Sequence, residues 1–156
     1  SNHGSLDKHD HQIEGINSRM DGIQAAVLLV KLKYIFEWNS KRQKHGIAYN
    51  ESLTDLKLVI PPAIRSEGEH VFHLYVIRSI ERDRLRNYLE ENGIATSIHY
   101  PVALPFVRAY RYLGLTMAEF PIAHKYQSEI LSIPIYPELM DKERSYIIDA
   151  LKKFYL

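Results

Sequence analysis

The chain has 156 residues, with 20 Lys and Arg against 19 Asp and Glu, and 46% of its residues are hydrophobic. This length fits one domain with an added arm, and the balanced charge gives no indication of nucleic acid or an anionic membrane surface as a partner. The chain has no cysteine. Disulfides and thiolate catalysis are therefore excluded, and a reducing cytoplasm is the expected location.

The N-terminal segment, residues 1–18, is polar and rich in histidine. It is expected to be extended or loop-like, without the apolar stretch of a signal peptide. His3, His9 and His11 form a conceivable metal site, since the last two have the spacing of a strand. No fourth ligand is evident, so a polar tail without a metal is the favoured interpretation.

Residues 19–53 are predicted to form a helical arm. Lys31 and Lys33 keep its apolar run below the roughly 18 residues that a membrane-spanning helix needs, so no membrane partner is expected. The helix is apolar nearly all round and must be covered on more than one side. A second, more polar helical segment follows over residues 39–53, with a break expected near Trp38. One apolar stripe has helical spacing: Met20, Ile23, Val27, Val30, Tyr34 and Trp38.

Residues 54–156 have the sequence pattern of a small α/β domain. Strands rich in β-branched and aromatic residues, or ended by proline, are predicted over residues 56–64, 70–78 and 94–101. Helices with amphipathic patterns, or with glycine and proline at their ends, are predicted over residues 81–93, 105–114, 121–133 and 141–155. The expected fold class is α/β (α+β), a long helical arm followed by a small domain.

Chemistry-bearing residues are sparse in this pattern. No Ser-His-Asp spacing, phosphate-binding glycine loop or paired-carboxylate motif is recognisable. His70 and His73 lie on opposite faces of a predicted strand. At least one of them is expected to be a core or edge histidine without a catalytic role.

Several segments resemble one family when taken together. They are "GINSRMDGIQAAVLLVKL" (residues 15–32), "WNSKR" (38–42), "GIATSIHYP" (93–101) and "ILSIPIYPEL" (130–139), with "NHGS" near the start. In this order they resemble the C-terminal part of the DegT/DnrJ/EryC1/StrS family of pyridoxal-phosphate-dependent sugar aminotransferases. The resemblance implies the small C-terminal domain of a fold type I transferase. It also implies a homodimer with active sites built across the subunit interface, which would explain the all-round apolar helix.

The resemblance also implies a substrate, a cofactor and site residues. The intact enzyme would use pyridoxal 5'-phosphate to move an amino group from glutamate or glutamine to a nucleotide-linked keto-sugar. Asn17 would donate its amide to the cofactor phosphate of the neighbouring subunit. Arg19 offers a forked cation suited to phosphate or carboxylate, with a turn-fixing salt bridge as the alternative.

His99 and Tyr100 match the family's strand-end His-Tyr-Pro, near the entrance for the nucleotide-sugar. They are the expected substrate-binding pair, with a packed histidine and a capping tyrosine as the alternative. After Pro101 this sequence has "VALPF", where many relatives carry a second histidine. This departure weakens the case for a substrate role of the loop.

Enzymes of this family need a lysine that forms a Schiff base with the cofactor, and the matched segments lack it. None of the ten lysines stands in the family's lysine context, and Lys8, the nearest to the matching end, has the wrong surroundings. The chain is therefore predicted to be a C-terminal fragment that contains no catalytic residue and is inactive alone. The alternative is a stand-alone α/β module that binds a ligand or a protein, for which an uncovered apolar arm would be an aggregation hazard.

Overall fold

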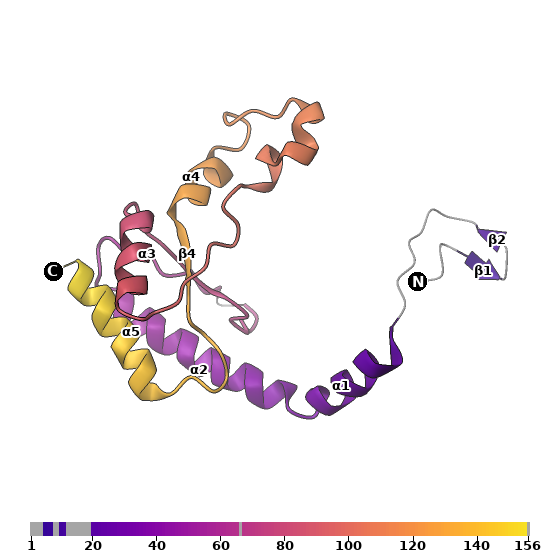
Figure 1. The fold of residues 1–156 in the computed structure, drawn as a ribbon, viewed down its shortest axis with the longest axis horizontal. Helices are drawn as coiled ribbons and strands as arrows, with labels where there is room; N and C mark the ends of the chain where they lie inside the picture. Colours follow the sequence, from indigo (N-terminus) through magenta and orange to yellow (C-terminus); the bar gives the residue numbers. More distant parts are fainter. Residues whose placement is uncertain (1–4, 8–9, 12–19, 66, 156) are drawn as a thin grey trace. The chain divides into compact units, whose positions relative to one another are not determined.

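The computed structural model describes residues 20–65 and 67–155, and the backbone of residues 5–7 and 10–11. The chain divides into two compact units, unit 1 (residues 1–37) and unit 2 (residues 38–156). Figure 1 labels their helices and strands. None of the helices in the described ranges is long and apolar enough to cross a membrane.

Unit 1 contains a short antiparallel pair, β1 (Ser5–Asp7) and β2 (Asp10–His11), and the helix α1 (Gly22–Leu32). Asp21 caps α1, because its Oδ1 accepts a hydrogen bond of 2.8 Å from the Ile23 amide. No residue of α1 is buried.

The predicted break in the helical arm exists but lies ahead of Trp38. The helix α1 ends at Leu32 and α2 (Ile35–Leu53) begins after a two-residue turn. In this turn the amides of Lys33 and Tyr34 donate to the carbonyls three residues earlier, at 3.3 and 3.0 Å. Such bonds tighten the chain into a 3₁₀-like turn and end the α-helical ladder.

The sheet of unit 2 is a narrow antiparallel one. Its two strands, β3 (Tyr75–Arg78) and β4 (Ile130–Ile133), pair over their full length. Single bridges extend it on both sides, from Ile60 to β3 and from Ser97 to β4. The remaining elements of the unit are α3 (Arg82–Glu91), η1 (Leu104–Phe106), η2 (Arg108–Leu113), α4 (Pro121–Glu129) and α5 (Asp141–Phe154).

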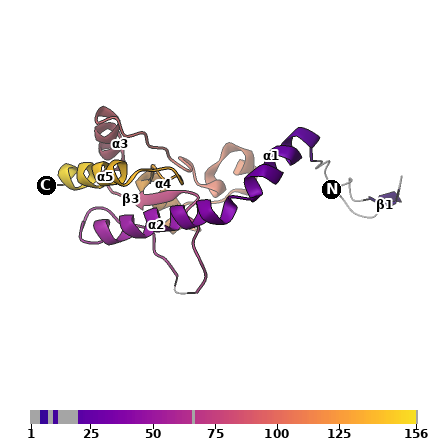
Figure 2. The same cartoon turned by 90° about the horizontal axis from the view of Figure 1, so that it is seen from below.

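Helices α2, α3 and α5 enclose the hydrophobic core together with one face of this sheet. Tyr75 pairs with Ile133 and Ile77 with Leu131, and all four side chains are buried. The helix α5 contacts α3, and in Figure 2 it lies between α3 and α2. The helices contribute the buried residues Tyr49, Leu53, Leu85, Leu89, Ile147 and Leu151. The predicted mixed fold class is therefore confirmed.

The predicted strands lie where expected along the chain but are shorter than predicted. The strand predicted over residues 70–78 begins only at Tyr75, because Phe72 adopts a left-handed backbone with φ of 47°. The strands predicted over residues 56–64 and 94–101 are reduced to one bridge each. Proline cannot donate to a strand ladder, which limits pairing around Pro61 and Pro62.

The predicted helix over residues 121–133 is wrong in its last third. The helix α4 stops at Glu129, and the next residue already begins β4. Pairing with β3 overrides the helical pattern here, since Leu131 and Ile133 bury their side chains as strand residues. Residues 105–114 form 3₁₀ turns instead of one helix and end, as predicted, at Gly114 with φ of 64°. The helices predicted over residues 81–93 and 141–155 are confirmed as α3 and α5.

Candidate functional site

A serine and a histidine meet on the sheet face opposite the core. Ser132 lies between two core residues of β4, so its side chain points to the other face. Its backbone exchanges two hydrogen bonds with Ser97, at 3.1 and 2.7 Å. His99 follows Ser97 by two residues and shares its face, and its Nδ1 lies 2.9 Å from Ser132 Oγ. Ser132 is 5% exposed and His99 is half-buried.

A cavity of about 310 Å³ adjoins this pair. Neither carboxylate, lysine nor arginine is among the described residues that line it. Its polar lining consists of hydroxyl groups and the imidazole. These residues are Thr96, Ser97, His99, Ser132 and Tyr136.

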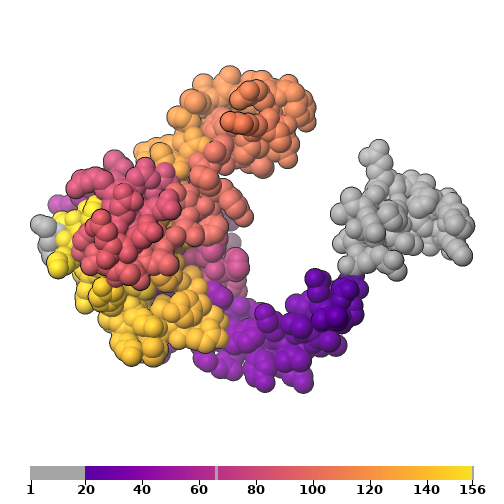
Figure 3. All heavy atoms as spheres, viewed as in Figure 1, coloured from indigo at the N-terminus to yellow at the C-terminus, as the bar shows by residue number. Residues whose placement is uncertain are grey.

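Tyr100 is the exposed neighbour of the pair. It is 74% exposed and meets the His99 ring edge-on, with 5.8 Å between the ring centroids. Beyond it the chain enters η1 and η2, in which no residue is buried. This part of unit 2, coloured orange in Figure 3, projects from the rest of the unit. The two predicted substrate-binding residues, which are neighbours in the sequence, thus follow the bridge at Ser97 on the edge of the sheet and precede η1.

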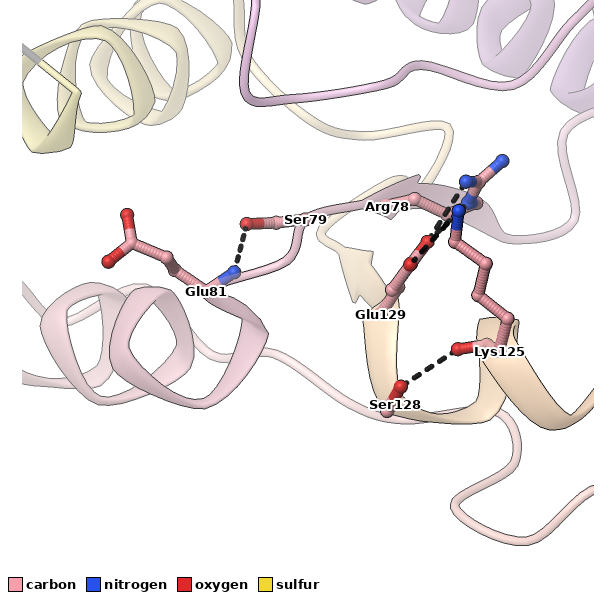
Figure 4. A network of polar contacts seen from close by, with 6 residues as sticks. All are labelled: Arg78, Ser79, Glu81, Lys125, Ser128 and Glu129. Atoms are coloured by element: carbon pink, nitrogen blue, oxygen red, sulfur yellow. Dashed lines mark hydrogen bonds and ion pairs between the residues drawn. The ribbon is translucent and has the colours of Figure 1, made fainter.

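An ion-pair network fastens β3 to the start of β4 (Figure 4). Arg78 donates from Nε and Nη2 to the same carboxylate oxygen of Glu129, at 3.0 and 2.9 Å. Its guanidinium also stacks on the Tyr126 ring, 3.6 Å from the centroid. Lys125 Nζ lies 3.9 Å from the other oxygen of Glu129. Because Glu129 is buried, this pairing is what makes its charge tolerable at the α4–β4 junction.

A second polar contact joins α2 to α5. Arg144 Nη1 lies 2.9 Å from Nδ1 of the buried His45 and 2.7 Å from Asp141 Oδ1. An arginine can only donate, so His45 Nδ1 accepts and the imidazole is neutral. Burial, and then the charge of Arg144, lower the pKa of His45.

The other predicted residues have varied outcomes. Asn17 and Arg19 lie outside the described residues. His70 and His73 are both exposed, and the strand that would have placed one of them in the core does not reach them. His70 Nδ1 accepts from the Phe72 amide at 3.0 Å. In the part of the chain that the structure describes, no group of three or more potential ligands could hold a metal ion.

Ser132, Glu129 and His45 were not found from the sequence. A signal for Ser132 existed, because a lone hydroxyl inside the apolar run "ILSIPI" has to find a partner when it is buried. The same holds for Glu129 next to that run. His45 sits in a helix with a weakly amphipathic pattern, so its burial had no comparable signal.

Comparison with solved structures defines the class of this fold. The chain superimposes with a TM-score of 0.90 on Streptomyces venezuelae DesV in complex with a ketimine intermediate, at 34% identity over 99% of this chain and 42% of that chain. A DegT/DnrJ/EryC1/StrS aminotransferase from Brucella abortus gives 0.84, at 32% identity over 98% of this chain and 40% of that one. The fold is thus one found in fold type I pyridoxal-phosphate aminotransferases.

Sequence comparison makes the assignment more specific. Residues 1–152 match the DegT/DnrJ/EryC1/StrS aminotransferase family, and the chain belongs to it. It is 38% identical to a pleiotropic regulatory protein of Geobacillus stearothermophilus, over 98% of this chain and 42% of that protein. It is 34% identical to the dTDP-3-amino-3,4,6-trideoxy-alpha-D-glucose transaminase of Streptomyces venezuelae, over 98% and 40%. The chain therefore spans about two fifths of the length of these relatives.

The lysines of the described ranges lie at the surface and apart from the cavity. Every lysine in the described ranges is exposed, and none of them lines the cavity beside His99.

Proposed function

We propose that this chain is the C-terminal portion of a pyridoxal-phosphate-dependent aminotransferase. The intact enzyme transfers an amino group from glutamate or glutamine to a nucleotide-linked keto-sugar. The supporting observation is the coverage: 98% of this chain matches 40% of a dTDP-sugar transaminase. The exposed lysines agree with a Schiff-base lysine in a large domain outside this sequence. A cytoplasmic location remains part of the proposal and rests on the cysteine-free sequence.

In this proposal the chain helps to bind and orient the cofactor and the nucleotide-sugar. The bound cofactor supplies the electron sink for amino transfer. Asn17 donates its amide to the cofactor phosphate, and Arg19 pairs with a phosphate or carboxylate. His99 and Tyr100 contact the nucleotide-sugar. The cavity beside His99, with its hydroxyl-rich lining, supports this placement.

The homodimer belongs to the same proposal. Apolar side chains on α1 are exposed, including Ile23 at 78% and Leu29 at 65%. So much exposed apolar surface on one helix is typical of a protein interface. In the intact enzyme we expect α1 to be buried against the large domain and the partner subunit.

The first test compares this chain with the longer protein encoded by an upstream extension of its reading frame. With pyridoxal phosphate and borohydride, the chain alone should show no stoichiometric modification of a single lysine, because no described lysine is held in a site. The longer protein should be modified at one lysine and should transfer an amino group from glutamate or glutamine. One stoichiometrically modified lysine in the short chain would contradict the proposal, and a start codon just before its first residue would favour a stand-alone module.

The second test is Asn17→Ala in the longer enzyme. Loss of one hydrogen bond to a charged acceptor should weaken cofactor binding by roughly tenfold to a hundredfold, with the melting temperature of the apoenzyme unchanged. Asn87→Ala, at an exposed position on α3, is the matched control. If Asn17 is only a turn residue, its loss should cost about 0.5–2 kcal/mol of stability and leave cofactor affinity unchanged.

A further inference from the structure

Which of Ser132 and His99 donates the hydrogen bond between them determines which ring nitrogen of His99 carries the proton. We propose that Ser132 is a positioning residue that holds the neutral His99 ring with its proton on Nε2, so that His99 donates a hydrogen bond to an acceptor oxygen of the substrate. This inference rests on the substrate role proposed above for His99.

Ser132 is held too firmly to follow movements of the histidine. It lies inside β4 opposite Val76 of β3, and both of its backbone groups bond to Ser97 on the other side. Its flanking residues, Leu131 and Ile133, are buried in the core. The backbone that carries the hydroxyl is therefore fixed on both sides, and the His99 ring meets this hydroxyl at 2.9 Å.

The direction of this hydrogen bond follows from satisfying a buried hydroxyl. A serine hydroxyl has one proton to donate and two lone pairs that accept. Within the described residues, His99 Nδ1 is the contact recorded for this hydroxyl. If Nδ1 donated to it, the O–H would have no acceptor among the described protein groups, which costs more than an unused lone pair. The hydroxyl therefore donates to Nδ1, and the neutral ring carries its proton on Nε2.

The consequence for recognition is an uncharged donor beside the cavity. An Nε2–H group binds an oxygen acceptor and gives nothing to an N–H or O–H that needs an acceptor. A nucleotide-sugar presents such acceptors in its sugar and in its phosphates. The described lining of the cavity holds no lysine or arginine, so its side-chain donors are uncharged, and His99 would contribute an N–H donor of fixed position beside the hydroxyls of Thr96, Ser97 and Tyr136.

The first experiment measures the proton position in this chain. The imidazole ¹⁵N chemical shifts of labelled protein, recorded at a pH where His99 is neutral, distinguish the two tautomers. Essentially pure Nε2–H is expected for His99 in the unaltered chain. Ser132→Ala should return the ring to the mixture of both tautomers, with Nε2–H the major form, that a free neutral histidine shows. Ser132→Thr, which retains a hydroxyl, should keep the pure form. Ser97→Ala is the matched control, because it lies in the same bridge and leaves the Ser132 hydroxyl intact.

Either of two results overturns the positioning role. One is an Nδ1–H pattern in the unaltered chain, which decides the matter even if Ser132→Ala fails to fold. The other is an equally pure Nε2–H pattern in a folded Ser132→Ala variant. A purely structural role of Ser132 predicts the tautomer mixture of a free histidine in both proteins.

The second experiment uses the longer enzyme. Ser132→Ala should raise the KM for the nucleotide-sugar by about twofold to tenfold, the range for one neutral hydrogen bond. The half-reaction with the amino donor should be unchanged. Binding of the nucleoside diphosphate alone identifies the acceptor: a similar loss indicates a phosphate oxygen, and no loss indicates a sugar oxygen. If the ¹⁵N pattern holds but KM is unchanged, the substrate role of His99 is overturned while the aminotransferase assignment stands.

Discussion

Helices α1 and α5 both carry apolar side chains, but only those of α5 are buried within their own unit. The 14 residues of α5 carry one apolar face, and its four buried residues pack into the core of unit 2. The 11 residues of α1 are more uniformly apolar, yet none of them is buried. An amphipathic pattern thus predicts that the apolar face packs within the same unit. A helix that is apolar all round is expected to pack against further protein surfaces, which the described part of unit 1 does not provide.

The largest expected effect comes from exchanging one leucine in each helix. Leu151→Ala in α5 removes a fully buried side chain and should lower the free energy of unfolding of this chain by about 2–5 kcal/mol. Leu29→Ala in α1, where the side chain is 65% exposed, should change it by less than about 0.5 kcal/mol. Urea denaturation of both variants gives the comparison. Equal losses would show that α1 is covered, either within one chain or by a second copy of it.

The second prediction concerns pH and the contact between α2 and α5. Burial and Arg144 lower the pKa of His45 below its ordinary value of 6.5. The unfolded chain therefore takes up a proton that the folded chain refuses, and stability falls as the pH drops below about 6.5. Unfolding free energies measured between neutral and mildly acidic pH should show a slope of up to about 1.4 kcal/mol per pH unit from this group.

The groups around His45 set the sign and the controls of that experiment. Arg144 and Lys44 oppose its protonation, while Asp141 and the Pro137 carbonyl favour it. His45→Gln keeps an acceptor for Arg144 and should flatten the slope. His73→Gln, at an exposed histidine, should leave it unchanged. A slope that survives His45→Gln would assign the acid sensitivity to another group.

The smallest effect is expected at the start of α1. Asp21→Ala removes the cap on the Ile23 amide, a contribution of about 0.5–2 kcal/mol to the helix. Because no residue of α1 is buried, this loss should stay local. Amide hydrogen exchange in the first turn should accelerate by roughly two- to thirtyfold, while the urea midpoint of unit 2 is unchanged. Asp21→Asn retains a side-chain oxygen as acceptor and should stay near the original rate.

Local patterns predicted the helices of this fold better than its strands. The helices α3 and α5 follow from amphipathic spacing and, for α3, from the stop at Gly93. The strand β4 could not be predicted from local pattern, because its apolar run continues the pattern of α4 and only pairing with β3 makes it extended. Single bridges such as that of Ser97 depend on tertiary contacts in the same way.

The sequence named only part of the candidate site, for a related reason. Resemblance to the family pointed to His99 and Tyr100, which are neighbours in the sequence and whose substrate role stays a prediction. It did not point to Ser132, whose contact with His99 spans 33 positions of sequence. A residue that positions another side chain has no local sequence motif, because its role depends on which distant segments are paired in the sheet.

The direct passage from α4 into β4 limits how the length of this chain can vary. Side chains of a strand alternate between faces, so one residue inserted between Glu129 and Ile130 would shift β4 by one position against β3. The serine would then face the core, and its two apolar neighbours would face away from it. Insertions and deletions in homologues should therefore avoid this junction and collect in the exposed turn ahead of α4, residues 114–119, where an added residue alters no pairing.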